Sequence, residues 1–156
     1  LRYVDDFVLV HESREQLEPW KIAIERFLRD ELHLSLKDDV RLRPLCAGID
    51  FLGYVVFPTH TLVRQRVVQH MRAKLAAIER RLVSASGRRI RATPQDLRHA
   101  ASVIGSYQSH FRHANALRLQ EALRARYPWM RAIAGVHRRF DYRMEGRHIV
   151  VPIASP

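Results

Sequence analysis

Two adjacent carboxylates stand inside an otherwise apolar segment at the start of the chain, and they limit what this segment can form. The segment is Leu1-Arg-Tyr-Val-Asp-Asp-Phe-Val-Leu-Val10, with Asp5 and Asp6 between two apolar stretches. Adjacent carboxylates repel each other and cost free energy in an apolar setting. A tight hairpin would place both acids at its turn, where Asp is favoured. The pattern fits either a solvated turn on an ordinary hairpin or a site for a divalent cation such as Mg²⁺, which takes carboxylate ligands.

The charge of the chain is distributed unevenly. Residues 1–60 hold 8 Lys/Arg and 11 Asp/Glu, whereas residues 61–156 hold 19 Lys/Arg and 5 Asp/Glu. A basic surface of this density attracts phosphate backbones, and arginine contacts phosphate with two parallel hydrogen bonds. A genome of high GC content would explain the excess of arginine over lysine. It would not explain the shortage of acids after residue 60, so we expect a nucleic-acid partner.

Length and composition exclude several classes of protein. The 156 residues suffice for one ordinary domain or two small ones. No stretch approaches the roughly 20 apolar residues of a membrane span, and no signal-peptide pattern is present. The single Cys46 excludes an internal disulfide and fits a reducing compartment. We therefore expect a cytoplasmic protein without a membrane partner.

Apolar spacing predicts one helix and several strands up to residue 60. Ser13 and Gln16 form a capping-box pattern, although Pro19 favours a helix start nearer Glu18. The apolar stripe of this helix is expected to pack on the sheet that carries the acids. The expected strands cover residues 32–36 and 40–45, with a turn at 37–39. Residues 49–57 are expected to form a pair of strands that turns near Gly53.

The second part of the chain is predicted to be a small helical bundle. One helix is indicated by an apolar stripe of Val67, Val68, Met71, Leu75, Ile78 and Leu82. Thr93-Pro94-Gln95-Asp96 is typical of a helix start, and the apolar face of that helix is Leu97, Ala101, Ile104, Tyr107 and Phe111. A third helix is expected from Asn115 to Arg126, before Pro128. Residues 84–92 are expected to form a basic linker, and residues 143–151 a hairpin around Glu145 and Gly146.

Three blocks of the sequence resemble reverse transcriptases in their order and rough spacing. Tyr3-Val4-Asp5-Asp6 resembles the catalytic Tyr-x-Asp-Asp hairpin of the family, and residues 20–36 resemble the helix and strand that follow it in the palm. Gly48-Ile-Asp-Phe-Leu-Gly-Tyr54 resembles the Phe-Leu-Gly hairpin that grips the primer end. Residues 106–119 are similar to a thumb segment of bacterial enzymes, most like those of diversity-generating retroelements, with group II intron enzymes second.

The resemblance implies an α+β fold. Its first part would be a partial palm, made of antiparallel strands with one packed helix, and a helical thumb bundle would follow. The implied units are the C-terminal part of the palm over residues 1–60, the thumb over 61–135, and a tail over 136–156 that is expected to form a hairpin.

The resemblance also implies an RNA-directed DNA polymerase that extends a DNA primer on an RNA template. Its substrates would be deoxynucleoside triphosphates, and its cofactors two Mg²⁺ ions, with Mn²⁺ as an alternative. Asp5 would be the main metal ligand and Asp6 would support it. Lys37 would donate a proton near the leaving pyrophosphate, or would be an ordinary solvated turn lysine. An accessory protein of the retroelement is a further expected partner.

Two more sets of residues are candidates for contact with nucleic acid. The primer-binding set is Tyr3, Phe51, Leu52, Gly53 and Tyr54. The set for the thumb is Arg64, Arg66, Arg72, Lys74, Arg112 and His113. The nine histidines do not show the ligand spacing of a zinc site. His110 and His113 are therefore expected to contact nucleic acid or to pack.

One metal-binding Asp of the family belongs to an earlier strand of the palm, and no such strand precedes Leu1. We therefore expect a fragment of a longer parent enzyme, inactive by itself. The alternatives are a non-catalytic basic RNA- or DNA-binding remnant of a retroelement, and an unrelated basic helical protein with an acidic turn.

Overall fold

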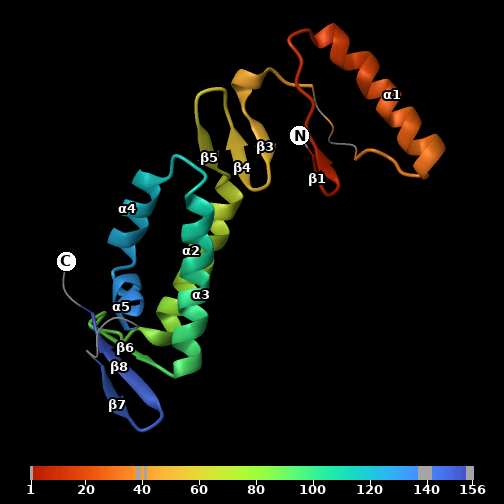
Figure 1. Ribbon diagram of the computed structural model, residues 1–156. Coiled ribbons are helices and arrows are strands. Elements are labelled where there is room, and N and C mark those ends of the chain that lie inside the picture. Colours follow the sequence, from red (N-terminus) through yellow and green to blue (C-terminus); the bar gives the residue numbers. More distant parts are fainter. Residues whose placement is uncertain (1, 38–39, 41, 137–141, 154–156) are drawn as a thin grey trace.

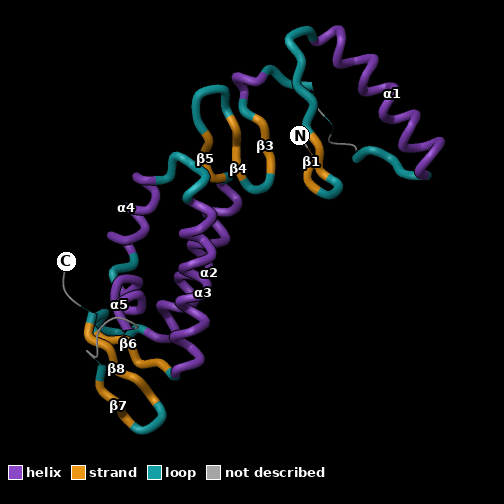
Figure 2. Tube along the Cα trace, in the orientation of Figure 1, coloured by secondary structure: helices purple, strands orange, loops and turns teal. Residues whose placement is uncertain are grey.

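The computed structural model is elongated, with the helix of residues 14–32 and the acidic hairpin towards one end and a small sheet at the other (Figure 1). The structure describes residues 2–37, 40, 42–136 and 142–153. Strands lie at both ends of the group of helices formed by residues 65–136, and one further helix lies beyond the N-terminal hairpin (Figure 2). The described residues form five α-helices and small antiparallel sheets, so the expectation of a mixed α+β fold is confirmed.

The first two strands form the predicted hairpin. β1 (Arg2–Tyr3) pairs antiparallel with β2 (Asp6–Phe7), and Tyr3 lies opposite Asp6. The turn between them consists of Val4 and Asp5. Asp5 therefore lies in the turn, and Asp6 is the first residue of the returning strand.

Helix α1 (Arg14–Leu32) begins directly after Ser13, whose side chain accepts a hydrogen bond from the Gln16 N–H at 3.3 Å. The expectation of a start nearer Glu18 is wrong, and Pro19 lies inside the helix. Proline removes one backbone hydrogen bond there. The cap supports the first turn, and so does the ion pair from Arg14 Nε to Glu18 Oε1 at 3.2 Å.

The expected packing of α1 on the acidic hairpin is also wrong, because no residue of this helix is buried. Phe27 retains 55% of its accessible surface and Ile22 retains 65%. The predicted strands over 32–36 and 40–45 do not form in the part of these ranges that the structure describes. Alternating leucines favour a strand only where a partner supplies the ladder of hydrogen bonds. The predicted turn at 37–39 lies partly outside the described residues.

The middle of the molecule is a three-stranded antiparallel sheet. β3 (Ile49–Phe51), β4 (Tyr54–Val56) and β5 (Thr61–Val63) lie in sequence order, so the predicted strand pair around Gly53 is confirmed. A single turn of 3₁₀-helix, Leu45–Ala47, leads into β3. The register places Phe51 opposite Tyr54, and the two-residue turn is Leu52-Gly53.

The hydrophobic core lies in the C-terminal part of the chain. Every buried hydrophobic residue in the described part lies between Met71 and Val151. α2 (Gln65–Leu82) buries Met71, Leu75, Ile78 and Leu82, four members of the predicted stripe. α3 (Pro94–Phe111) begins with the predicted capping box, in which the Asp96 N–H donates to Thr93 and the Asp96 carboxylate accepts from the Thr93 N–H. α4 (Leu117–Arg126) and α5 (Trp129–Val136) complete the helices.

A second three-stranded sheet closes the far end of the bundle (Figure 1). The predicted hairpin is formed by β7 (Arg143–Glu145) and β8 (His148–Pro152). β8 lies between β7 and β6 (Arg89–Ala92). The expectation that residues 84–92 form only a linker is therefore wrong for β6. This short strand depends on a partner more than 50 residues away in sequence, which no local pattern indicates.

Within the described residues, no helix is both long and apolar enough to cross a membrane.

Candidate functional site

The acidic turn presents both carboxylates to solvent. Asp5 and Asp6 are exposed, as are Tyr3 and Val4 beside them. The Arg2 guanidinium donates to the Val4 carbonyl oxygen at 3.0 Å, so its Nε contacts the backbone. No ion pair found among the described residues includes Asp5 or Asp6. The two carboxylates are therefore accessible to a cationic ligand.

Val4 has a left-handed backbone conformation, with φ at 54°. Val4 but not Asp5 has a positive φ, and a hairpin turn with a positive φ at its first central position alone normally has glycine there. A β-branched residue at positive φ is an outlier, and such a conformation costs about 1–3 kcal/mol. Strain of this kind occurs preferentially at functional sites. The backbone of the turn that carries the acids is therefore strained at Val4. A two-residue turn with glycine at this position would avoid the strain.

The donor set of the turn fits a hard divalent cation in part. Both side chains offer only carboxylate oxygens, and Mg²⁺ commonly takes one or two carboxylates together with substrate phosphates. In the part of the chain that the structure describes, no group of three or more His, Cys, Asp or Glu could hold a metal ion. Asp5 and Asp6 thus supply two ligands, and a two-metal site needs more.

Lys37 lies in the coil after α1, and its side chain is exposed. Its carbonyl oxygen accepts a hydrogen bond from the Val40 N–H at 3.3 Å. The predicted role as a proton donor stays a prediction.

The hairpin of the predicted primer-binding residues is fixed to the end of α3. The Tyr54 ring stacks on the His110 ring, with centroids 4.2 Å apart and planes 9° apart. The Tyr54 hydroxyl donates to the His110 carbonyl oxygen at 2.9 Å, and His110 Nδ1 lies 3.1 Å from the same hydroxyl oxygen. Burial in this contact raises the pKa of Tyr54 above its ordinary value, because the charged phenolate would be less solvated. From the sequence, Tyr54 was predicted to bind the primer, but the contact between Tyr54 and His110 was not predicted.

The turn of this hairpin has two residues with positive φ, Leu52 at 49° and Gly53 at 85°. This is the pattern of a type I′ turn, which matches the twist of a two-residue hairpin. The Gly53 carbonyl oxygen accepts from the Arg64 N–H at 2.9 Å. Leu52 is exposed at the tip, while Phe51 is partly buried. The tip thus presents the apolar Leu52 side chain, on a turn whose backbone is fixed by the hydrogen bond from Arg64.

The predicted basic residues of the helical unit are all exposed, and the contacts of Arg64 and Lys74 differ. Arg64 Nη2 lies 3.3 Å from Asp50 Oδ2. Lys74 Nζ lies 5.7 Å from the centroid of the Tyr107 ring, a cation–π arrangement. Arg66 and Arg72 lie on α2, and Arg112 and His113 follow at the end of α3.

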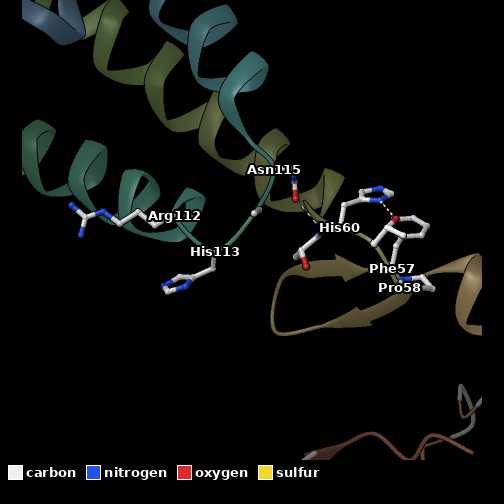
Figure 3. Close-up of a pocket in the computed structure, with 9 residues that line it drawn as sticks. Phe57, Pro58, His60, Arg112, His113 and Asn115 are labelled. Carbon is white, nitrogen blue, oxygen red and sulfur yellow. Dashed lines mark hydrogen bonds between the residues drawn. The ribbon is translucent and has the colours of Figure 1, made fainter.

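A hollow of about 510 Å³ lies between the β4–β5 loop and the α3–α4 loop (Figure 3). Its lining residues are Phe57 to Thr61 and Arg112 to Asn115. Asn115 joins the two loops: its Oδ1 accepts from the Thr61 N–H at 3.2 Å, and its N–H donates to the Thr61 carbonyl oxygen at 2.7 Å. Phe57 and His60 stack at 4.6 Å on one side, and Arg112 and His113 point away from them on the other (Figure 3). The sequence interpretation missed Phe57 and His60, for which the only signal was an aromatic pair around Pro58.

Comparison with protein-family models, with curated proteins and with solved structures finds no match to this chain.

Proposed function

We propose that this chain is the C-terminal palm and thumb of an RNA-directed DNA polymerase. The observation that carries the proposal is the exposed, strained hairpin turn in which two adjacent acids follow Tyr3 and Val4. An ordinary solvated turn gains nothing from strain or from adjacent like charges. A turn that binds cations gains from both acids, because their mutual repulsion is removed when the cation binds.

In the proposed reaction, Asp5 and Asp6 would hold divalent cations beside the primer end. Bound Mg²⁺ would stabilise the charge that develops on the attacking and leaving oxygens. The β3–β4 hairpin would position the primer, with Leu52 at its tip and Gly53 allowing close approach of the backbone. Tyr54 would keep this hairpin fixed to α3 through its contact with His110. Lys37 would protonate the leaving pyrophosphate.

We assign polymerisation to a longer parent protein and expect the 156-residue chain to be inactive by itself. Two carboxylates are an incomplete donor set for two metal ions. The described residues supply no third ligand in a group with them. The basic helical unit has a core of its own and would bind the template and primer independently of the acids.

A non-catalytic nucleic-acid-binding remnant is the second candidate. The excess of 19 Lys/Arg over 5 Asp/Glu after residue 60 favours it, since this charge alone suffices to bind phosphate backbones. In that case the acids would have no role. Binding would be unchanged by Asp5→Ala and steeply dependent on salt.

Primer extension on an RNA template separates the two candidates. The assay would compare this chain with a protein extended upstream, each in the presence of Mg²⁺ or Mn²⁺. Asp5→Ala and Asp6→Asn should abolish extension by the longer protein. Glu12→Gln should not, although it removes a similar exposed charge close to the hairpin. Extension that survives Asp5→Ala would refute the polymerase proposal, and salt-sensitive RNA binding without extension by either protein would favour the remnant.

A further inference from the structure

The outer face of the C-terminal sheet carries a row of arginines. In β6, Arg89 and Arg91 are exposed, while Ile90 and Ala92 between and after them are buried. In the sheet register, Val150 of β8 lies opposite Arg91 on one side and opposite Arg143 of β7 on the other. Residues directly opposite each other project from the same face of a sheet. Arg89, Arg91 and Arg143 therefore share the face that points away from the core.

The register also gives the spacing of this row. Arg89 and Arg91 are two residues apart on one strand, about 7 Å. Arg91 and Arg143 are separated by one intervening strand, which places their backbones about 10 Å apart. Arg88 before β6 and Arg147 in the β7–β8 turn are exposed at the ends of the same sheet. We call the three arginines on the outer face, Arg89, Arg91 and Arg143, the arginine face.

The arginine face has little acidic compensation. Glu145 is the sole acid in residues 83–92 and 142–153. None of the ion pairs found among the described residues includes Arg89, Arg91 or Arg143. On α1, by contrast, Arg14, Arg26 and Arg29 each lie within ion-pair distance of an acid. The charge of the arginine face is thus available to an external anion.

We propose that the arginine face binds the phosphate backbone of nucleic acid, as a contact separate from the acidic turn. Arginine is suited to this role because its guanidinium donates to two phosphate oxygens at once. The face offers only Val150 and Pro152 as apolar residues, and it carries no aromatic side chain other than the His148 ring. Interfaces between proteins depend on buried aromatic or large apolar anchors, so nucleic acid is favoured over an acidic protein.

This proposal extends the proposed function and rests on it for the choice of nucleic acid as the ligand. The sheet and the β1–β2 hairpin lie towards opposite ends of the molecule, with α2 to α5 between them (Figure 1). Nucleic acid held there would be bound far from the acids, through contacts that do not read its sequence. The arginine face would thus anchor the template–primer and would take no part in the chemistry.

The test measures how binding of a labelled RNA–DNA primer–template duplex depends on salt, by fluorescence anisotropy with the full chain. The variant is R89Q/R91Q/R143Q. The matched control is R14Q/R26Q/R29Q, which removes the same number of exposed charges from ion-paired positions on α1. Affinity falls with salt, and each lost phosphate contact makes the slope of log affinity against log salt shallower by about 0.9. The loss of three contacts therefore makes the slope shallower by about 2.7. Between about 50 mM and 200 mM salt, the wild type should then lose about 40-fold more affinity than the variant.

Two further variants keep the test decisive if the triple variant unfolds. Lysine at the same three positions should keep the slope, because it keeps the charge. Glu145→Gln removes the acid on the same face and should raise affinity at low salt. Equal slopes for the sheet variant and the α1 control would overturn the proposal. If the wild-type chain binds no nucleic acid, both this proposal and the proposed function fail. If the wild-type chain binds nucleic acid and the sheet variant and the α1 control have equal slopes, only the proposal for the arginine face fails.

Discussion

Replacing Gly53 with alanine should release the β3–β4 hairpin from α3. Gly53 has φ at 85°, in the left-handed region that costs an L-residue about 1–2 kcal/mol. An alanine Cβ would also lie 3.1 Å from His110 Cε1 and 3.3 Å from His110 Nε2. Contacts this short require the imidazole ring to move.

The ring has little freedom to move, because it is stacked on Tyr54 and hydrogen-bonded beside it. Moving it weakens an interaction worth about 0.5–1.5 kcal/mol. Together with the cost of the left-handed backbone, Gly53→Ala should destabilise this hairpin by about 1.5–3.5 kcal/mol. The site would then lose the contact that positions the proposed primer-binding turn.

Hydrogen exchange at the Arg64 amide is the direct measurement, since this N–H donates to the Gly53 carbonyl oxygen at 2.9 Å. A loss of about 1.5–3.5 kcal/mol corresponds to an increase in exchange of about 10- to 300-fold, at about 1.4 kcal/mol per tenfold. Gly146→Ala is the matched control. It has φ at 61° in a similar turn, but no atom lies within 4 Å of the added Cβ. The control should destabilise its own hairpin by only about 1–2 kcal/mol and leave Arg64 unchanged.

A third glycine calibrates the comparison. Gly105 lies exposed within α3, without positive φ and with nothing within 4 Å of an added Cβ. Gly105→Ala should therefore stabilise the helix by about 0.5–1 kcal/mol. If Gly53→Ala left Arg64 exchange at the wild-type rate, the argument that His110 fixes the hairpin would be refuted.

Three further variants test other parts of the structure. Tyr54→Phe should cost about 0.5–1.5 kcal/mol at pH 7, and the difference from wild type should shrink as the pH rises above about 10. The sign follows from the raised pKa of Tyr54: the stabilisation by the neutral phenol is fully present below about pH 10 and is lost at higher pH. Urea unfolding of both proteins at pH 7 and above about pH 10 checks this, and a difference that stays constant with pH would contradict it. Thr93→Ala should cost about 1 kcal/mol, seen as a lower urea midpoint, through loss of the capping box with Asp96. Ile90→Ala should cost about 2–5 kcal/mol in thermal unfolding, whereas Arg91→Ala on the other face of β6 should stay within about 0.5 kcal/mol.

The parts of the fold that could be predicted are those fixed by neighbours in sequence. Ser13 and Thr93 mark helix starts because a capping side chain bonds to a backbone N–H three residues later. The stripe from Met71 to Leu82 gives α2 because residues three and four apart share one face. The turn at Gly53 is likewise determined by residues that are neighbours in sequence. In each case the interaction that decides the structure spans a few residues.

The parts that could not be predicted depend on distant partners. Arg89-Ile90-Arg91-Ala92 has the composition of a basic linker, and only pairing with β8 makes it a strand. Leu34 and Leu36 alternate like a strand, but the described residues give them no partner strand. The stack of Tyr54 on His110 joins residues 56 positions apart, so it leaves no local signal. The roles of Asp5 and Asp6 stay predictions; the hairpin and the place of Asp5 in its turn followed from the sequence, whereas Asp6 begins β2.

The proposed metal chemistry and the proposed binding of nucleic acid make different demands on the fold. Catalytic groups must be held within about 0.5 Å of their working positions by packed neighbours. β1 and β2 have two residues each, and an isolated two-stranded hairpin is marginal in water. Tyr3 and Phe7 are exposed on its strands, and Val4 adds strain without a compensating contact from the core. The proposed metal chemistry at Asp5 and Asp6 therefore requires these apolar side chains to be covered, whereas the helical unit already has the core that the proposed binding of nucleic acid requires. Binding should consequently persist under conditions in which catalysis is absent, and the two activities should respond to different substitutions.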